Sequence, residues 1–197
     1  MHPPERRLRL LALLLLLPAL QGCAALAALY SVNAVHDRRT FGTVVDDDAM
    51  AVRVTDAIHR GEDGPGDGNH VRAVSYNRTV LLVGEVESEA VSELAEERAK
   101  RVPKVVRVVN ELEVTEPRSL GRRSRDSLLT ARVKTALIGV DVPGFTPQRV
   151  KVVSVDGSVY LMGLLTEAEA DRIAERVARV RGVKEVIRII EFIPETG

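Results

Sequence analysis

The sequence predicts an α+β protein with two copies of one αββαβ module, each having two helices packed on a three-stranded mixed sheet. Three observations lead to this fold class. The chain repeats itself at a nearly constant offset, apolar residues recur at helical spacing, and short β-branched runs flank turn residues. Aromatic residues make up only 3% of the chain, so each module has a thin core. Two modules packed together would be more stable than either alone.

The internal repeat has an offset of 79 positions through most of the module. Matching positions include Arg53 and Arg132, Val54 and Val133, Ile58 and Leu137, Leu94 and Ile173, and the runs 79–84 and 158–163. The offset drops by one near the last strand, as a single-residue difference in a turn would cause. One supersecondary unit therefore accounts for most of the chain.

The first element of each copy is a helix, followed by a loop rich in Gly, Pro and Asp. The apolar helix positions are Met50, Val54, Ala57 and Ile58 in the first copy, and Leu129, Val133, Ala136 and Leu137 in the second. Spacings of three and four place each set on one helix face. The loops cover 61–68 and 139–147. The acidic first loop lacks the EF-hand spacing of a Ca²⁺ site, which favours an ordinary turn loop.

A β-hairpin comes next in each copy. In the second copy, strands over 150–155 and 159–165 flank Asp156-Gly157, a strong hairpin signal. Asn77-Arg78 occupies the equivalent turn of the first copy. Gly84 and Gly163 stand where the second strand leaves for a helix, and we expect them to serve the backbone through close packing or a positive φ.

A helix and a strand complete each copy. Helices rich in Glu, Ala and Arg are expected over 89–101 and 167–179, and β-branched strands over 105–114 and 183–193. Gly182 is placed to end the second of these helices. The modules then cover 46–115 and 126–194, joined by a basic linker at 116–125.

The N-terminal residues 1–22 indicate a lipoprotein signal peptide. Arginines precede the apolar run Leu10–Leu17, which is about half the ~20 residues that a membrane-spanning helix needs. Leu20-Gln21-Gly22-Cys23 resembles a lipobox, in which cleavage makes the lipid-modified cysteine the first residue. Cys23 is the single cysteine, so it has no disulfide partner in the chain, and lipidation removes a reactive thiol. The alternative is a plain secretory signal with a cysteine nearby by chance.

Residues 23–45 would form a lipid-anchored tether. Several acyl chains on Cys23 give stable anchoring, and Ala24 after the cysteine resembles the sorting signal for the outer membrane. We expect no transmembrane helix in the mature chain.

The motifs together resemble the BON module, in which a Val-x-Leu-x-Gly strand, a Glu/Ala helix and a Gly-Val-x-x-Val strand follow one another. The matching residues are Val80–Gly84, Val159–Gly163 and Gly182–Val186. Segments 37–43 and 161–167 are similar to the dual BON-domain outer-membrane lipoproteins of the DolP type. The resemblance implies a non-enzymatic protein facing the periplasm that supports outer-membrane integrity. It also implies that the first helix of the second module binds anionic phospholipid.

The repeat offers an internal comparison for such a site. Arg122, Arg123 and Arg125 approach the first helix of the second copy, where the first copy has Thr43, Val44 and Asp46. Leu128 lies three and four positions from Arg125 and Arg132, and its counterpart is Ala49. A leucine on a basic helix face suits insertion at the headgroup boundary. The residues expected to bind phospholipid are Arg122, Arg123, Arg125, Leu128 and Arg132.

Composition and motifs argue against other functions. The chain has 28 Lys and Arg against 28 Asp and Glu, so bulk charge does not indicate nucleic-acid binding. It contains no His/Cys spacing typical of metal sites, no catalytic elbow and no P-loop, and we expect no enzyme activity, metal or cofactor beyond the acyl chains on Cys23. The alternatives are an adaptor for outer-membrane assembly proteins, using an exposed edge strand such as 105–114, and a stress-related periplasmic BON protein.

Overall fold

The computed structural model describes residues 37–60, 66 and 69–194. The predicted signal peptide, Cys23 and the tether up to residue 36 lie outside the described residues. Within the described residues, no helix combines the length and apolar character that a membrane crossing requires. Residues from Arg38 onward belong to one unit, and both modules lie within it.

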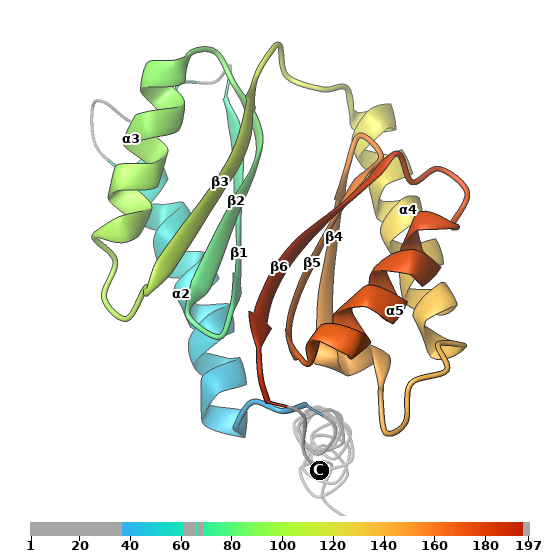
Figure 1. Ribbon diagram of the computed structural model, residues 1–197. Helices are drawn as coiled ribbons and strands as arrows, with labels where there is room; N and C mark the ends of the chain where they lie inside the picture. Colours follow the sequence, from blue (N-terminus) through green and yellow to red (C-terminus); the bar gives the residue numbers. More distant parts are fainter. Residues whose placement is uncertain (1–36, 61–65, 67–68, 195–197) are drawn as a thin grey trace, which may run out of the picture. The chain divides into compact units, whose positions relative to one another are not determined.

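The predicted fold class is confirmed, because the order αββαβ occurs twice (Figure 1). The first module consists of α2 (Phe41–His59), β1 (His70–Tyr76), β2 (Thr79–Val86), α3 (Glu89–Lys100) and β3 (Arg107–Val114). The second consists of α4 (Leu120–Ile138), the short 3-10 helix η1 (Pro147–Arg149), β4 (Val150–Val155), β5 (Ser158–Leu165), α5 (Glu167–Ala178) and β6 (Glu185–Phe192).

Each module has a three-stranded mixed sheet. The first two strands pair antiparallel and the last pairs parallel to the central one, in the orders β1-β2-β3 and β4-β5-β6. Both hairpin turns have positive φ at their two central residues, as a type I′ turn requires. These φ angles are 46° and 63° at Asn77 and Arg78, and 47° and 92° at Asp156 and Gly157.

The first helix of each module starts earlier than the hydrophobic pattern indicated. α2 begins at Phe41, where the Thr40 hydroxyl accepts a hydrogen bond from the Thr43 N–H, and α4 begins at Leu120. The buried residues of α4 start only at Leu129, so its first turns extend past the core and carry no apolar periodicity. Most of the expected linker 116–125 is therefore helical, and its side chains have defined directions.

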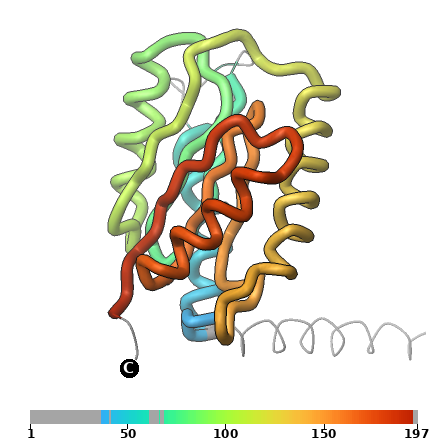
Figure 2. Tube along the Cα trace, turned by 45° about the vertical axis from the view of Figure 1, so that its right-hand side comes forward, coloured from blue at the N-terminus to red at the C-terminus, as the bar shows by residue number. Residues whose placement is uncertain are grey.

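Three apolar clusters form the core of this unit, one within each module and one between them. In each module the helices cover one face of the sheet, through a cluster that includes Val54 and Leu82 in the first and Val133 and Leu161 in the second. The third cluster joins the remaining faces of the two sheets, with Val74, Leu81 and Val83 against Tyr160, Met162 and Ile189. The result is four layers in the order helices, sheet, sheet, helices (Figures 1 and 2).

Polar contacts add to this apolar interface. The Arg38 guanidinium donates to both carboxylate oxygens of Glu169, at 2.7 and 2.9 Å, and to the Leu164 carbonyl at 3.0 Å. The neighbouring Arg39 pairs with Asp47 at 2.7 Å and stacks 3.8 Å from the ring centre of Tyr76. Consecutive arginines at the start of the unit therefore bind opposite modules.

Gly84 occupies a position that no other residue fits well. Its φ is +133°, and an added Cβ would lie 1.8 Å from the His70 carbonyl oxygen across the hairpin. Gly163 has no positive φ, and its Cβ would lie 3.1 Å from the Arg149 carbonyl oxygen. Glycine at 84 is thus required both by the positive φ and by the close approach of the neighbouring strand. Glycine at 163 is required by the close approach alone.

We expect Gly84→Ala to lower the free energy of unfolding by at least about 3 kcal/mol, because strained φ and the backbone clash add together. Gly121→Ala is the matched control, since its Cβ would meet nothing closer than the Ser119 hydroxyl at 4.0 Å. That change should be neutral or stabilising by up to about 1 kcal/mol. Urea unfolding measures both, and similar values for the two variants would contradict this account of Gly84.

Candidate functional site

A groove runs beside α4 and contains four of the five residues expected to bind phospholipid. Its volume is about 660 Å³. The expected residues that line it are Arg122, Arg125, Leu128 and Arg132. The opposite wall comes from the β4–β5 turn, at Asp156 and Gly157, and from the loop before β6, at Gly182 and Lys184. Helical spacing brings the four α4 residues to one side of the helix.

Two glycines make room in this groove. Gly157 and Gly182 have φ values of +92° and +102°, and neither carries a side chain that would fill the space. A Cβ at Gly182 would lie 3.5 Å from a Leu129 methyl and 3.9 Å from Arg132 Nη1. The Arg132 guanidinium therefore lies close to bare backbone, on the wall of the groove.

The groove carries a net positive charge. Arg122, Arg125 and Arg132 make no hydrogen bond or ion pair with the residues that the structure describes, and all three are exposed. Lys184 and Asp156 pair with each other at 2.9 Å. The hydrogen bond from Lys184 lowers the pKa of Asp156 most, and the charges of Arg118 and Arg122 lower it further. The guanidinium groups of these three arginines thus have no ion-pair partner within the part of the chain that the structure describes.

An exposed leucine lies among these cations. Leu128 is 57% exposed, and it is three positions from Arg125 and four from Arg132. Its counterpart in the first module, Ala49, is exposed as well but presents a single methyl group. The chemical combination of an apolar tip and flanking guanidinium groups occurs at this position of the second module only.

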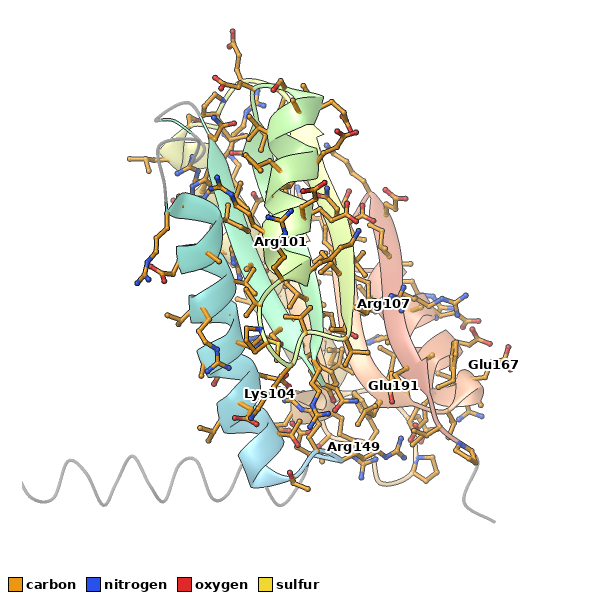
Figure 3. All side chains as sticks on the ribbon, turned by 90° about the vertical axis from the view of Figure 1, so that its left-hand side faces the viewer. Arg101, Lys104, Arg107, Arg149, Glu167 and Glu191 are labelled. Carbon is orange, nitrogen blue, oxygen red and sulfur yellow. The ribbon has the colours of Figure 1, made fainter. Side chains whose placement is uncertain are left out.

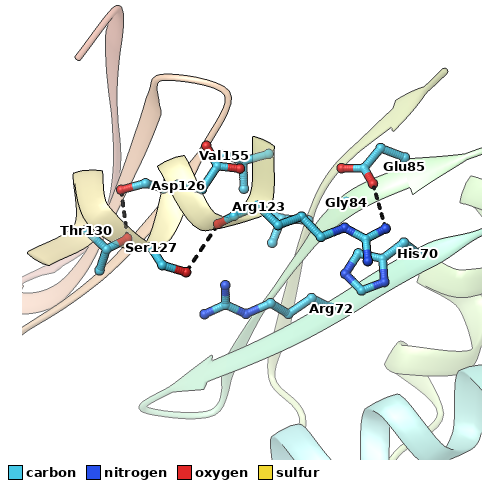
Figure 4. A pocket seen from close by; sticks show the side chains of 11 residues that line it. His70, Arg72, Gly84, Glu85, Arg123, Asp126, Ser127, Thr130 and Val155 are labelled. Carbon is cyan, nitrogen blue, oxygen red and sulfur yellow. Dashed lines mark hydrogen bonds and ion pairs between the residues drawn. The ribbon is translucent and has the colours of Figure 1, made fainter. Parts of the chain in front are cut away.

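Arg123 lies apart from the other four. Two positions along a helix correspond to a rotation of about 200°, so Arg123 and Arg125 point to nearly opposite sides. Arg123 lines a separate cavity between the modules, with its Nη2 3.8 Å from Oε2 of Glu85 (Figure 4). The sequence places Arg123 and Arg125 in a predicted linker, and without a helix their spacing does not indicate which way each side chain points.

The acidic run of the first module does not form a free surface. Asp46 pairs with Lys104 at 2.9 Å, in the loop that approaches α2 (Figure 3), and Asp48 pairs with Lys151 of the second module at 3.4 Å. Asp47 is fully buried. The two modules still differ as expected, because α2 lacks arginines at the positions of Arg122 and Arg125. The aspartates of α2, however, are paired with lysines or buried and do not form an acidic surface.

Asp47 and Asp126 are equivalent residues that sequence reasoning did not single out. Asp47 accepts hydrogen bonds from the N–H groups of Asn77 and Arg78, at 2.6 and 2.9 Å, and thereby supports the turn. Asp126 accepts one from the Asp156 N–H at 2.9 Å, and burial raises the pKa of its carboxyl group. They stand 79 positions apart, so the repeat offset itself was the signal that could have identified them.

We expect Asp47→Ala to cost about 3–5 kcal/mol of unfolding free energy, because it strips a buried partner from Arg39 and from two turn amides. Asp126→Ala removes a single backbone hydrogen bond and should cost about 1–2 kcal/mol. Urea unfolding of the two variants gives the comparison. Equal costs would show that the two carboxylates do the same structural work.

No group of three or more His, Cys, Asp or Glu able to hold a metal ion occurs among the described residues. The groove itself offers guanidinium donors and one exposed apolar side chain.

Comparison with known proteins places these features in context. The family model of the BON domain matches residues 46–116 and 125–194. Outer membrane lipoprotein DolP of Haemophilus influenzae is 36% identical, over 88% of this chain and 90% of its own length. The 21 kDa hemolysin of Actinobacillus pleuropneumoniae is 34% identical, over 80% and 79% of the two chains. Osmotically-inducible protein Y of Escherichia coli is 33% identical, over 74% and 72%.

Proposed function

Because this chain belongs to the dual BON-domain family that includes the lipoprotein DolP, we propose that it is a non-catalytic outer-membrane lipoprotein that binds anionic phospholipid. Its second module holds the lipid site, in the groove beside α4, and lipid binding supports outer-membrane integrity. Cys23 carries the anchor, and the modules face the periplasm.

The groove on α4 is the observation that carries the proposal. Arg122, Arg125 and Arg132 have no protein partner among the described residues, and Leu128 is exposed between them. Guanidinium groups pair well with the phosphates of lipid headgroups. Near an anionic surface each basic residue contributes on the order of 1 kcal/mol, and partial burial of the leucine adds about 1 kcal/mol.

These contributions favour a weak, reversible contact. Their sum of about 4 kcal/mol corresponds to a dissociation constant in the millimolar range. A lipid anchor on Cys23 makes such a contact useful, because it keeps the groove at a high effective concentration next to the bilayer.

The length of the tether allows the groove to reach the bilayer that holds the anchor. The groove lies at the start of β5, beside Gly157, whereas Arg38 binds the Leu164 carbonyl near the end of that strand. An eight-residue strand is about 26 Å long. Residues 24–37 can span about 45–50 Å when fully extended, so the anchored chain can bring the groove to the same bilayer.

We expect Leu128→Glu to weaken binding to vesicles rich in phosphatidylglycerol at least tenfold, because it replaces the inserting side chain with a charge that anionic lipid repels. Ala49→Glu makes the same chemical change on the first module and should alter binding less than twofold. Sedimentation with the unlipidated chain 23–197, carrying Cys23→Ser, measures both. Equal losses of vesicle binding from the two variants would contradict the assignment of the lipid site to α4.

The two faces of α4 can be separated by a second pair of variants. Arg125→Gln should weaken binding to the same vesicles about fivefold, since it removes about 1 kcal/mol of attraction, and the loss should shrink as salt is raised. Arg123→Gln should change vesicle binding less than twofold, because Arg123 faces Glu85 and not the groove. A larger loss from Arg123→Gln would place the lipid on the other face of α4.

A second candidate function is that of a protein-interaction adaptor. β3 pairs with β2 along one edge and lies at the end of its sheet, so its other edge is open to a partner strand within the described part of the chain. Arg107, Glu111 and Glu113 place charges on that strand, which discourages strand addition. We therefore rank the adaptor second. Absence of binding by the unlipidated chain even at millimolar concentrations of accessible anionic lipid would favour it.

A further inference from the structure

A second cavity, of about 270 Å³, lies at the junction of the two modules (Figure 4). His70, Arg72 and Glu85 line it from β1 and β2 of the first module. Arg123, Asp126 and Thr130 line it from α4 of the second. The face of α4 that lines this cavity is the one turned away from the lipid groove, so the cavity is a separate site.

Glu85 brings a buried carboxylate to the edge of this cavity. Its side chain is 4% exposed and pairs with the equally buried Arg118, whose Nε lies 3.5 Å from Oε1. The Arg118 N–H donates to the other carboxylate oxygen at 3.3 Å. Arg118 is shared, however, because its Nη2 also pairs with Glu113 of β3 at 2.5 Å.

Arg123 has an unused donor in this cavity. Its Nη2 lies 3.8 Å from Glu85, a weak ion pair, and its Nε is buried with no hydrogen-bond partner among the described residues. A buried donor without a partner costs about 1–3 kcal/mol, which an incoming acceptor would recover. Arg123 is thus incompletely satisfied by the protein itself.

Arg72 brings a second cation to the same space. Figure 4 shows its side chain reaching from β1 toward α4, while Arg123 reaches from α4 toward Glu85 and His70. Arg72 makes no hydrogen bond or ion pair with the described residues. Against these two arginines stands Asp126, which accepts a hydrogen bond from the Asp156 N–H. The two lining arginines thus face two lining carboxylates, and the donors of Arg72 and the Nε of Arg123 still have no hydrogen-bond acceptor among the described residues.

We propose that this cavity binds a small oxyanion, a carboxylate or phosphate group, between the guanidinium groups of Arg72 and Arg123. Guanidinium groups bind such planar or tetrahedral oxyanions with paired, charge-assisted hydrogen bonds. The volume is just below the range of about 300–1,000 Å³ that is usual for ligand pockets, so the ligand is small. The proposal is independent of the lipid groove, with which the cavity shares only Asp126.

His70 gives the site a pH dependence of known sign. Burial lowers the pKa of its imidazole below the ordinary value of 6.5, and the charge of Arg123 lowers it further. Glu85 acts in the opposite direction, while Arg72 and His59 add to the lowering. A bound anion would raise this pKa, so by linkage the anion binds more tightly as the pH falls through the pKa of His70.

The test uses the chain 23–197 with Cys23→Ser, observed by ¹H–¹⁵N NMR at constant ionic strength. Sodium phosphate and sodium acetate are titrated separately, and the Arg123 Nε–H and the amides of Gly84 and Ser127 are followed. At least one of the anions should shift all three signals in a saturable way, with the same midpoint anion concentration for each. Lowering the pH toward the lowered pKa of His70 should tighten the acetate midpoint, which gives the clean comparison because acetate stays ionised whereas phosphate itself gains a proton.

Arg72→Gln should weaken the midpoint at least tenfold, and because Arg72 has no partner among the described residues its loss leaves the fold intact. Arg107→Gln, an exposed arginine on β3, is the matched control and should have no effect. Arg125→Gln should leave this midpoint unchanged while weakening vesicle binding, so the two proposals fail separately. Shifts that never saturate with either anion, or that respond equally to Arg72→Gln and Arg107→Gln, would overturn the site.

Discussion

The two faces of each central strand set the main constraint on this protein. β2 and β5 are buried along nearly their whole length, with side chains on both faces removed from water. The helices of a module can cover one face only, and the other face would expose Val74, Leu81 and Val83. A single module would therefore leave an apolar sheet in water. Packing against a second module removes that surface, which accounts physically for the tandem arrangement.

Sheet-to-sheet packing leaves the helices on the outside, where their exposed residues can differ between the modules without disturbing the core. Both modules keep the buried apolar stripe of the first helix, and both keep the aspartate that supports the hairpin turn, Asp47 or Asp126. Within the described part of the chain, α4 surrounds an exposed leucine with three unpaired arginines, whereas α2 has an exposed alanine and keeps Arg53 alone of these arginine positions. Duplication thus separates the residues that the fold needs from those that the proposed membrane contact would use.

α4 takes part in two chemically different surfaces. One side contributes Arg125, Leu128 and Arg132 to an open groove, and the other contributes Arg123 and Thr130 to a small cavity against the first module. Asp126 lies between them and hydrogen-bonds the β4–β5 turn. Because the helix is held by its buried face, either proposed ligand would meet a prepared arrangement of cations.

The sequence by itself determined the repeat, the order αββαβ, the hairpin turns and the apolar face of each helix, because these depend on local spacing and turn chemistry. It also identified the basic segment before and along α4. Only the tertiary structure decided the direction of each arginine. The helix starts at Leu120, outside the apolar pattern, and from that start Arg122, Arg125 and Arg132 face one way and Arg123 the other. Partners distant in sequence, such as Glu85 for Arg123 and Lys151 for Asp48, depend on how the sheets pack, which local spacing does not encode.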